Sequence, residues 1–130
     1  MPRNASILLG PAIPQLPSGN LDLTASFFQQ LGFAVAGNFP TQGFLIMQRD
    51  EAELHFWLAD SEDQARHFGG ASSCYIRVVN VDQLAAEFGE EGISTRYGPI
   101  DQPWGMREMQ IDDPYGNAIR FGEELNPGTT

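Results

Sequence analysis

The sequence predicts an α+β fold made of two βαβββ modules, and an internal repeat is the main reason. Asn20 and Asn80 each stand at a helix start with an aspartate two residues later, and Gly32 and Gly92 follow at the helix ends. Both pairs lie 60 residues apart. The segments around the helices alternate apolar and polar residues, as half-buried strands do. Neither half has enough core alone, so we expect one domain with a shared, curved, half-barrel-like mixed sheet and helices on its outer face.

The first module is expected over about residues 7–60. Residues 7–17 are apolar but carry three prolines, each of which removes a ladder donor, so they form an edge strand or an arm that leaves the sheet. The helix after Asn20 has one apolar face, formed by Leu21, Ala25, Phe28 and Leu31. Three strands should follow it, at residues 33–39, 44–48 and 53–59.

The second module is expected over about residues 72–124, after a polar linker at residues 60–71 in which His67 is a solvated loop histidine. Its strands are predicted at residues 73–79 and 93–97, and then in a hairpin. The hairpin turn is Asp113–Pro114–Tyr115–Gly116, where proline fixes φ and glycine tolerates positive φ. The strand before the turn sends Met109 and Ile111 to one face and Trp104, Met106, Glu108 and Gln110 to the other.

Alternation also assigns the two faces of the sheet. The face under the helices is the apolar one: Leu16, Leu45, Met47, Leu54, Phe56, Leu58, Cys74, Ile76, Val78, Ile119 and Phe121. The uncovered face mixes aromatic and polar residues: Ile13, Gln15, Phe44, Ile46, Glu53, His55, Trp57, Ser73, Tyr75, Arg77, Trp104, Glu108 and Arg120. Trp104 is either capped by a loop or lines a groove. Several aromatic residues facing water are unfavourable in a monomer, so a ligand or a second subunit should cover them.

The amino-acid composition limits the kinds of molecule that the protein is expected to bind. Seventeen acidic and seven basic residues give a net charge of −10, which argues against nucleic acid and anionic membranes and would attract a cationic small molecule. The single cysteine, Cys74, excludes an internal disulfide and a multi-cysteine metal cluster, and its apolar surroundings indicate a buried structural thiol. The N-terminus lacks the pattern of a signal peptide and no segment is apolar enough to span a bilayer, so a cytoplasmic location is expected.

Four stretches together resemble one family. These are LGF at 31–33, ELHFWLAD at 53–60, PWGMRE at 103–108 and DPYGNAIRF at 113–121, set in two βαβββ modules. The chain resembles the glyoxalase/bleomycin-resistance (vicinal oxygen chelate) superfamily, over roughly residues 12–124, and is most similar to its bleomycin-resistance branch. The DPxGN turn is common to the superfamily, whereas the run PWGxRE is more typical of the drug-binding branch.

The resemblance implies a test for a metal. Enzymes of this superfamily hold a metal on the uncovered sheet face through one ligand from each of four strands. The aligned positions here are Ile13, His55, Ser73 and Arg120. Isoleucine offers no lone pair, serine is a weak ligand and arginine repels a divalent ion, so we expect no metal and no other cofactor. His55 with Glu53 could be written as a general base pair, but they lie ~7 Å apart along the strand, and a polar groove wall is the preferred interpretation.

The leading hypothesis is a non-catalytic antibiotic-resistance protein that sequesters a bleomycin-type glycopeptide. The aromatic side chains on the uncovered face suit the flat bithiazole of such a drug, and the negative charge of the protein suits its cationic tail. The resemblance places Trp104, Tyr75, Phe44 and, less directly, Phe39 in the drug-binding groove, and alternation adds Trp57, His55 and Arg120. The alternatives are a lyase- or dioxygenase-type enzyme of the same superfamily, or a binding protein for another small apolar cation.

A homodimer is also expected. The aromatic face needs a cover, and the proline-rich N-terminal stretch could be exchanged between subunits. The resemblance implies that the first module of one chain faces the second module of the other, which gives two equivalent grooves.

Overall fold

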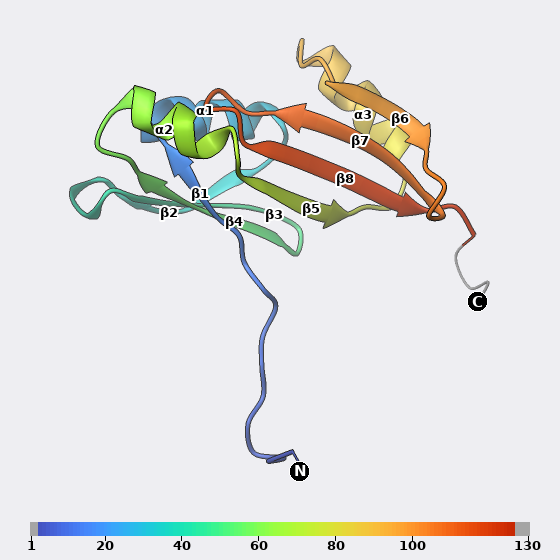
Figure 1. Ribbon diagram of the computed structural model, residues 1–130, viewed down its shortest axis with the longest axis horizontal. Helices are drawn as coiled ribbons and strands as arrows, with labels where there is room; N and C mark the ends of the chain where they lie inside the picture. Colours follow the sequence, from blue (N-terminus) through green and yellow to red (C-terminus); the bar gives the residue numbers. More distant parts are fainter. Residues whose placement is uncertain (1–2, 127–130) are drawn as a thin grey trace.

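The computed structural model describes residues 3–126, which form two open four-stranded sheets with three α-helices (Figure 1). The first sheet contains, in spatial order, β1 (Gln15–Ser18), β4 (Ala52–Leu58), β3 (Phe44–Arg49) and β2 (Ala34–Phe39). The second contains β5 (Ser73–Arg77), β8 (Ala118–Glu124), β7 (Met106–Asp112) and β6 (Tyr97–Asp101). Each sheet is mixed, because its first pair of strands is parallel and the others are antiparallel. The α+β fold with two repeated units is confirmed.

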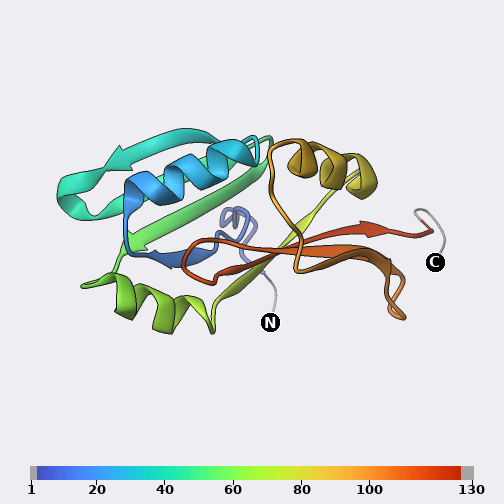
Figure 2. The same cartoon turned by 90° about the horizontal axis from the view of Figure 1, so that it is seen from above.

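Helices α1 (Leu21–Gln30) and α3 (Val81–Glu90) occupy equivalent places in the two units (Figure 2). The Asn20 side chain caps α1 by accepting from the Leu23 N–H at 3.0 Å, as predicted. The repeat breaks at α3, where the side chain of Asn80 makes no capping bond. The carboxylate of Glu123 on β8 accepts from Asn80 N and Val81 N instead, at 2.8 and 3.1 Å. A negative charge near a helix N-terminus stabilises the helix. A long-range contact from Glu123 therefore replaces the local cap.

One hydrophobic core joins the two units, as the small size of each predicts. Phe28 of α1 and Phe56 of β4 belong to the same buried cluster as Phe88 of α3 and Ile119 of β8. All four side chains are fully buried. The predicted apolar face is therefore confirmed, with one exception: Leu58, at the end of β4, is 43% exposed.

Three local predictions are wrong. The connection at residues 60–71 contains a helix, α2 (Glu62–Gly69), whose N-cap is Ser61 and whose last turn carries His67. Its polar composition hid the helix, because only Ala65 and Gly69 are buried. The strand predicted at residues 93–97 begins only at Tyr97. Trp104 precedes β7 in a turn, so strand alternation does not govern its direction.

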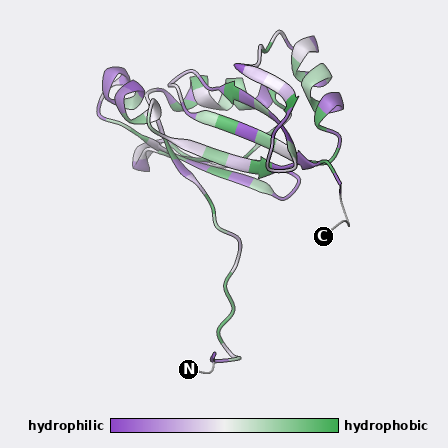
Figure 3. Cartoon of the chain, turned by 45° about the vertical axis from the view of Figure 1, so that its right-hand side comes forward, coloured by the Kyte–Doolittle hydropathy of each residue, from purple (hydrophilic) through white to green (hydrophobic). Residues whose placement is uncertain are grey.

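Residues 3–14 form an arm, and β1 is only four residues long. From Arg3 to Pro14 the chain has no strand or helix and extends away from both sheets (Figure 1). Hydrophobic residues lie along it (Figure 3), and Ile7, Leu8 and Leu9 are 62%, 89% and 93% exposed. Of the two possibilities left open for residues 7–17, the arm is correct up to Pro14.

The DPYGN turn joins the two units. Asp113 Oδ1 accepts from the backbone N–H groups of Tyr115 and Asn117, both at 2.9 Å. The Asn117 side-chain amide donates to the carbonyl of Pro17 in β1 at 2.9 Å. The Tyr115 hydroxyl donates to Glu62 of α2 at 2.8 Å. The turn therefore holds β1, α2 and the β7–β8 hairpin together.

We expect Asn117→Ala to lower the free energy of unfolding by about 1–3 kcal/mol, because buried acceptors on Pro17 and Asp113 lose their donor. Urea unfolding measures the change. Asn38→Ala is the control, since Asn38 is exposed on β2. Equal stability of the two variants would contradict the joining role of the turn.

Candidate functional site

Three predicted site residues of the first unit form one row across its sheet. Phe39 is the direct partner of Phe44, and Phe44 is the direct partner of Trp57. Directly paired residues project from the same face, so β2, β3 and β4 each supply one aromatic side chain. Phe39 is 46% exposed, and the ring of Phe44 lies edge-on to His55 with 5.1 Å between centroids.

Trp57 stands at the covered end of this row. Its ring is 5.8 Å from that of Phe68 on α2, and it packs against a small cluster formed by Ala59, Ala65 and Tyr115. The helix missed in the sequence thus covers part of the face expected to be open. Trp57 belongs to the wall of the face, whereas Phe39 and Phe44 lie away from α2.

His55 and Glu53 do meet, which corrects the expectation that their separation along β4 keeps them apart. His55 Nε2 lies 2.5 Å from Glu53 Oε2, which is within hydrogen-bond distance. The other three aligned metal positions do not join them: Ile13 has no donor atom, Ser73 is exposed, and the Arg120 guanidinium donates to Gln110 Oε1 at 3.0 Å. Residues 3–126 contain no group of three or more His, Cys, Asp or Glu side chains placed to hold a metal ion. These residues do not fit the metal site of the superfamily's enzymes.

The second unit presents a different cluster, centred on Glu108, which strand alternation places on the uncovered face but to which no role was assigned. Glu108 Oε2 accepts from the Trp104 indole N–H at 2.9 Å and from the Tyr75 hydroxyl at 2.7 Å. Glu108 itself is only 3% exposed, while Trp104 is 65% and Tyr75 43% exposed. Trp104 is therefore not capped by a loop: two exposed aromatic side chains are held by one buried acid. The only sequence signal for this was a glutamate four residues after a tryptophan.

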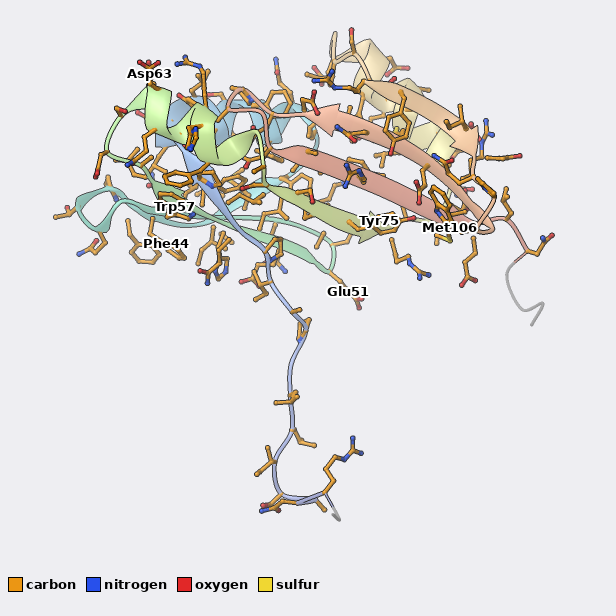
Figure 4. All side chains as sticks on the ribbon, viewed as in Figure 1. Phe44, Glu51, Trp57, Asp63, Tyr75 and Met106 are labelled. Atoms are coloured by element: carbon orange, nitrogen blue, oxygen red, sulfur yellow. The ribbon has the colours of Figure 1, made fainter. Side chains whose placement is uncertain are left out.

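A groove of about 550 Å³ lies between the arm, the start of β4, and β5. Ile13 of the arm, Glu53 of β4, and Ser73, Tyr75 and Arg77 of β5 line it. Figure 4 shows Phe44 and Trp57 at the first sheet and Tyr75 at the second. Within the described part of the chain no aromatic contact or hydrogen bond joins Phe39, Phe44 or Trp57 to Tyr75 or Trp104. The structure brings the predicted site residues together as two groups, one for each sheet.

A second cavity, of about 620 Å³, lies elsewhere between the units and includes Arg49, Glu87 and Phe88. No predicted ligand-binding residue lines it. Its main charges satisfy each other, since Arg49 Nη1 lies 2.6 Å from Glu87 Oε2 and also donates to the Leu31 carbonyl at 2.8 Å. The groove is the better candidate, because Tyr75 lines it and links it to the adjacent Glu108 and Trp104 through a hydrogen bond.

Cys74, predicted to be buried, is half-buried and packs against the core. Burial raises its pKa to about 11, so it stays protonated at neutral pH and is a poor nucleophile. Loss of water contact and the nearby Glu108 carboxylate raise the pKa of Tyr75 to about 12, from an ordinary value of 10.0. Tyr75 therefore stays a neutral hydrogen-bond donor throughout the physiological range.

The Tyr75 shift predicts a loss of stability in alkali. Its pKa in the folded state is raised, so its contribution to stability is complete below pH 10 and is lost as the pH rises toward 12. We expect the urea midpoint of Tyr75→Phe to fall less than that of the wild-type protein between pH 9 and pH 11.5. Parallel pH profiles would contradict the Tyr75–Glu108 hydrogen bond.

Comparison with known proteins gives a consistent result. The glyoxalase/bleomycin resistance protein/dioxygenase superfamily matches residues 11–121. A bleomycin resistance protein from Klebsiella pneumoniae is 30% identical over 117 residues, which cover 85% of this chain and 89% of that protein. One from Geobacillus stearothermophilus is 28% identical over 129 residues, covering 88% and 96%.

Solved structures agree. A bleomycin-binding protein complexed with bleomycin superposes with a TM-score of 0.74 at 26% identity, covering 89% of this chain and 99% of that one. A bleomycin resistance determinant encoded on the transposon Tn5 gives a TM-score of 0.75 at 26% identity, covering 91% and 100%. With its two βαβββ units and a match over most of its length, the chain belongs to the glyoxalase/bleomycin resistance protein/dioxygenase superfamily.

Proposed function

We propose that this protein binds and sequesters a bleomycin-type antibiotic without chemically changing it. The observation that carries the proposal is the pair of exposed rings, Trp104 and Tyr75, fixed by buried Glu108. Large exposed aromatic side chains are unfavourable unless a ligand or partner covers them, and flat heteroaromatic drugs stack on such rings. The similarity to bleomycin resistance proteins and to a bleomycin complex supports the choice of drug.

Calorimetric titration with metal-free and metal-loaded bleomycin tests the proposal. Each stacking contact is worth about 1–3 kcal/mol, by analogy with nucleic-acid bases stacked on aromatic side chains. Two or three such contacts must also offset the unfavourable free energy of association. Together they place the dissociation constant in roughly the micromolar range or below. The protein carries a net charge of −10, so association with the cationic drug should slow as salt is added. No heat at high micromolar drug would refute the assignment.

The non-catalytic part of the proposal rests on the donor set at the aligned metal positions, where Ile13, Ser73 and Arg120 are poor ligands. We expect protein purified without chelator to carry no stoichiometric metal. Elemental analysis after dialysis checks this. Stoichiometric nickel, iron, manganese or zinc that survives dialysis would favour an enzyme of the superfamily instead.

We also propose that the protein acts as a homodimer. The two groups of aromatic residues lie on different sheets of one chain, and pairing the first unit of one subunit with the second unit of the other would bring them to face each other. The exposed apolar arm supplies a segment that a second copy can cover. A two-fold axis would then generate two equivalent grooves.

The described residues include no helix that is long and apolar enough to cross a membrane.

A further inference from the structure

We propose that Glu108 is the counter-ion for a ligand that contacts Trp104 and Tyr75, so that the part of the ligand beside these two rings is an organic cation. This inference deepens the proposed function and rests on it for the identity of the drug. The chemical class follows from the cluster itself: a planar cation such as an amidinium or guanidinium, or an ammonium group beside a flat ring.

Glu108 is unusual because it is buried without a cationic partner. Its exposed fraction is 3%, and among residues 3–126 no Lys, Arg or His nitrogen lies within 4.0 Å of its carboxylate. Buried carboxylates are normally paired, since removing a charge from water without a partner is strongly unfavourable. The arginines of the same face are engaged elsewhere: Arg120 donates to Gln110 at 3.0 Å, and Arg77 lies 3.4 Å from Glu124.

The carboxylate also has room for a ligand. Both of its hydrogen bonds, from Trp104 and from Tyr75, end on Oε2. Oε1 accepts no hydrogen bond from the described residues, and it is not among their buried, unpartnered atoms, so it retains contact with the surface. A cation that stacks on either ring can therefore donate to Oε1.

The surrounding backbone is shaped for this cluster. Gly122 of β8 is the direct partner of Glu108, and a Cβ atom on Gly122 would come within 1.8 Å of the Tyr75 hydroxyl oxygen. Glycine weakens a strand interior, and it often marks a place where another group must approach closely. Here it lets Tyr75 reach across β8 from β5 to Glu108 on β7. A neutral acceptor would suffice to hold two exposed aromatic side chains, so the charge needs a further reason, and a cationic ligand supplies it.

Benzamidinium and benzamide form the test pair, because they share a flat ring and differ in charge. The experiment uses the full-length protein with the substitution Trp57→Phe, so that Trp104 is its only tryptophan. The fluorescence emission of Trp104 then reports binding. We expect benzamidinium to bind at least about fivefold more tightly than benzamide, and Glu108→Gln to abolish that preference. The amide oxygen of glutamine still accepts from Trp104 and Tyr75, so the fluorescence anisotropy of Trp104 without ligand should stay unchanged.

Glu90→Gln is the matched control, since it removes one negative charge from an exposed position of α3 and should keep the preference. Equal binding of the two probes, or a preference that survives Glu108→Gln, would overturn the inference whatever bleomycin does. If the Glu108-dependent preference for benzamidinium is found but bleomycin does not bind, the inference is supported and bleomycin is excluded as the ligand. If bleomycin binds, Glu108→Gln should weaken it about tenfold more than Glu90→Gln does, and equal weakening would count against the inference.

Discussion

Trp104→Ala should weaken bleomycin binding by about tenfold or more while leaving the fold intact, because one stacking contact is worth about 1–3 kcal/mol. The side chain is 65% exposed, and within residues 3–126 its one hydrogen bond goes to Glu108, so its removal leaves no cavity in the core. Titration calorimetry measures the affinity, and circular dichroism with urea unfolding checks the fold.

Tryptophan fluorescence gives an independent readout of the same variant. Trp57 and Trp104 are the two tryptophans of the chain, and Trp57 packs beside α2. The drug-induced change in emission should therefore disappear in Trp104→Ala or fall to the contribution of Trp57. Leu23→Ala is the control, since Leu23 is 45% exposed on α1 and should leave both affinity and emission change as they are. Unchanged affinity of Trp104→Ala would place the drug elsewhere.

Replacing Ile7, Leu8 and Leu9 of the arm by serine should convert the proposed dimer into a monomer. Burying each such side chain contributes about 1.5–3 kcal/mol, and a symmetric dimer would bury both arms. Ordering the two arms on dimerisation has an unfavourable conformational entropy, which offsets part of this burial free energy. The remaining loss should still raise the dissociation constant of the dimer by about a thousandfold or more. Sedimentation across nanomolar to micromolar concentrations distinguishes 14.3 kDa from twice that mass.

Val79→Ser is the control for the arm variant, because Val79 is 81% exposed but lies between β5 and α3. It should leave the dimer unchanged. A wild-type protein that stays monomeric at every concentration would refute the dimer. A triple-serine variant that dimerises as well as the wild type would instead refute the arm as the segment that joins the subunits.

The sequence by itself determined the repeated architecture and most of the two faces. Period-two alternation places Leu45 and Met47 on one face of β3, and helical spacing buries Phe28, because both patterns are set by local backbone geometry. Gly32 and Gly92 end their helices with φ of 84° and 75°, a left-handed conformation that glycine adopts without strain. The resemblance to the superfamily also followed from local runs, above all PWGMRE and DPYGN.

The tertiary structure decided the features that depend on distant partners. Helix α2 has little apolar pattern of its own, and it is held by Tyr115, whose hydroxyl bonds to Glu62. The cap of α3 comes from Glu123, more than 40 residues away in the chain, so the local Asn80 signal misidentified it. The Glu108 cluster likewise joins residues separated by 33 positions and passes over Gly122, a contact that no local period encodes. Periodicity reports which face a side chain occupies, whereas only the folded chain decides which side chains on that face meet.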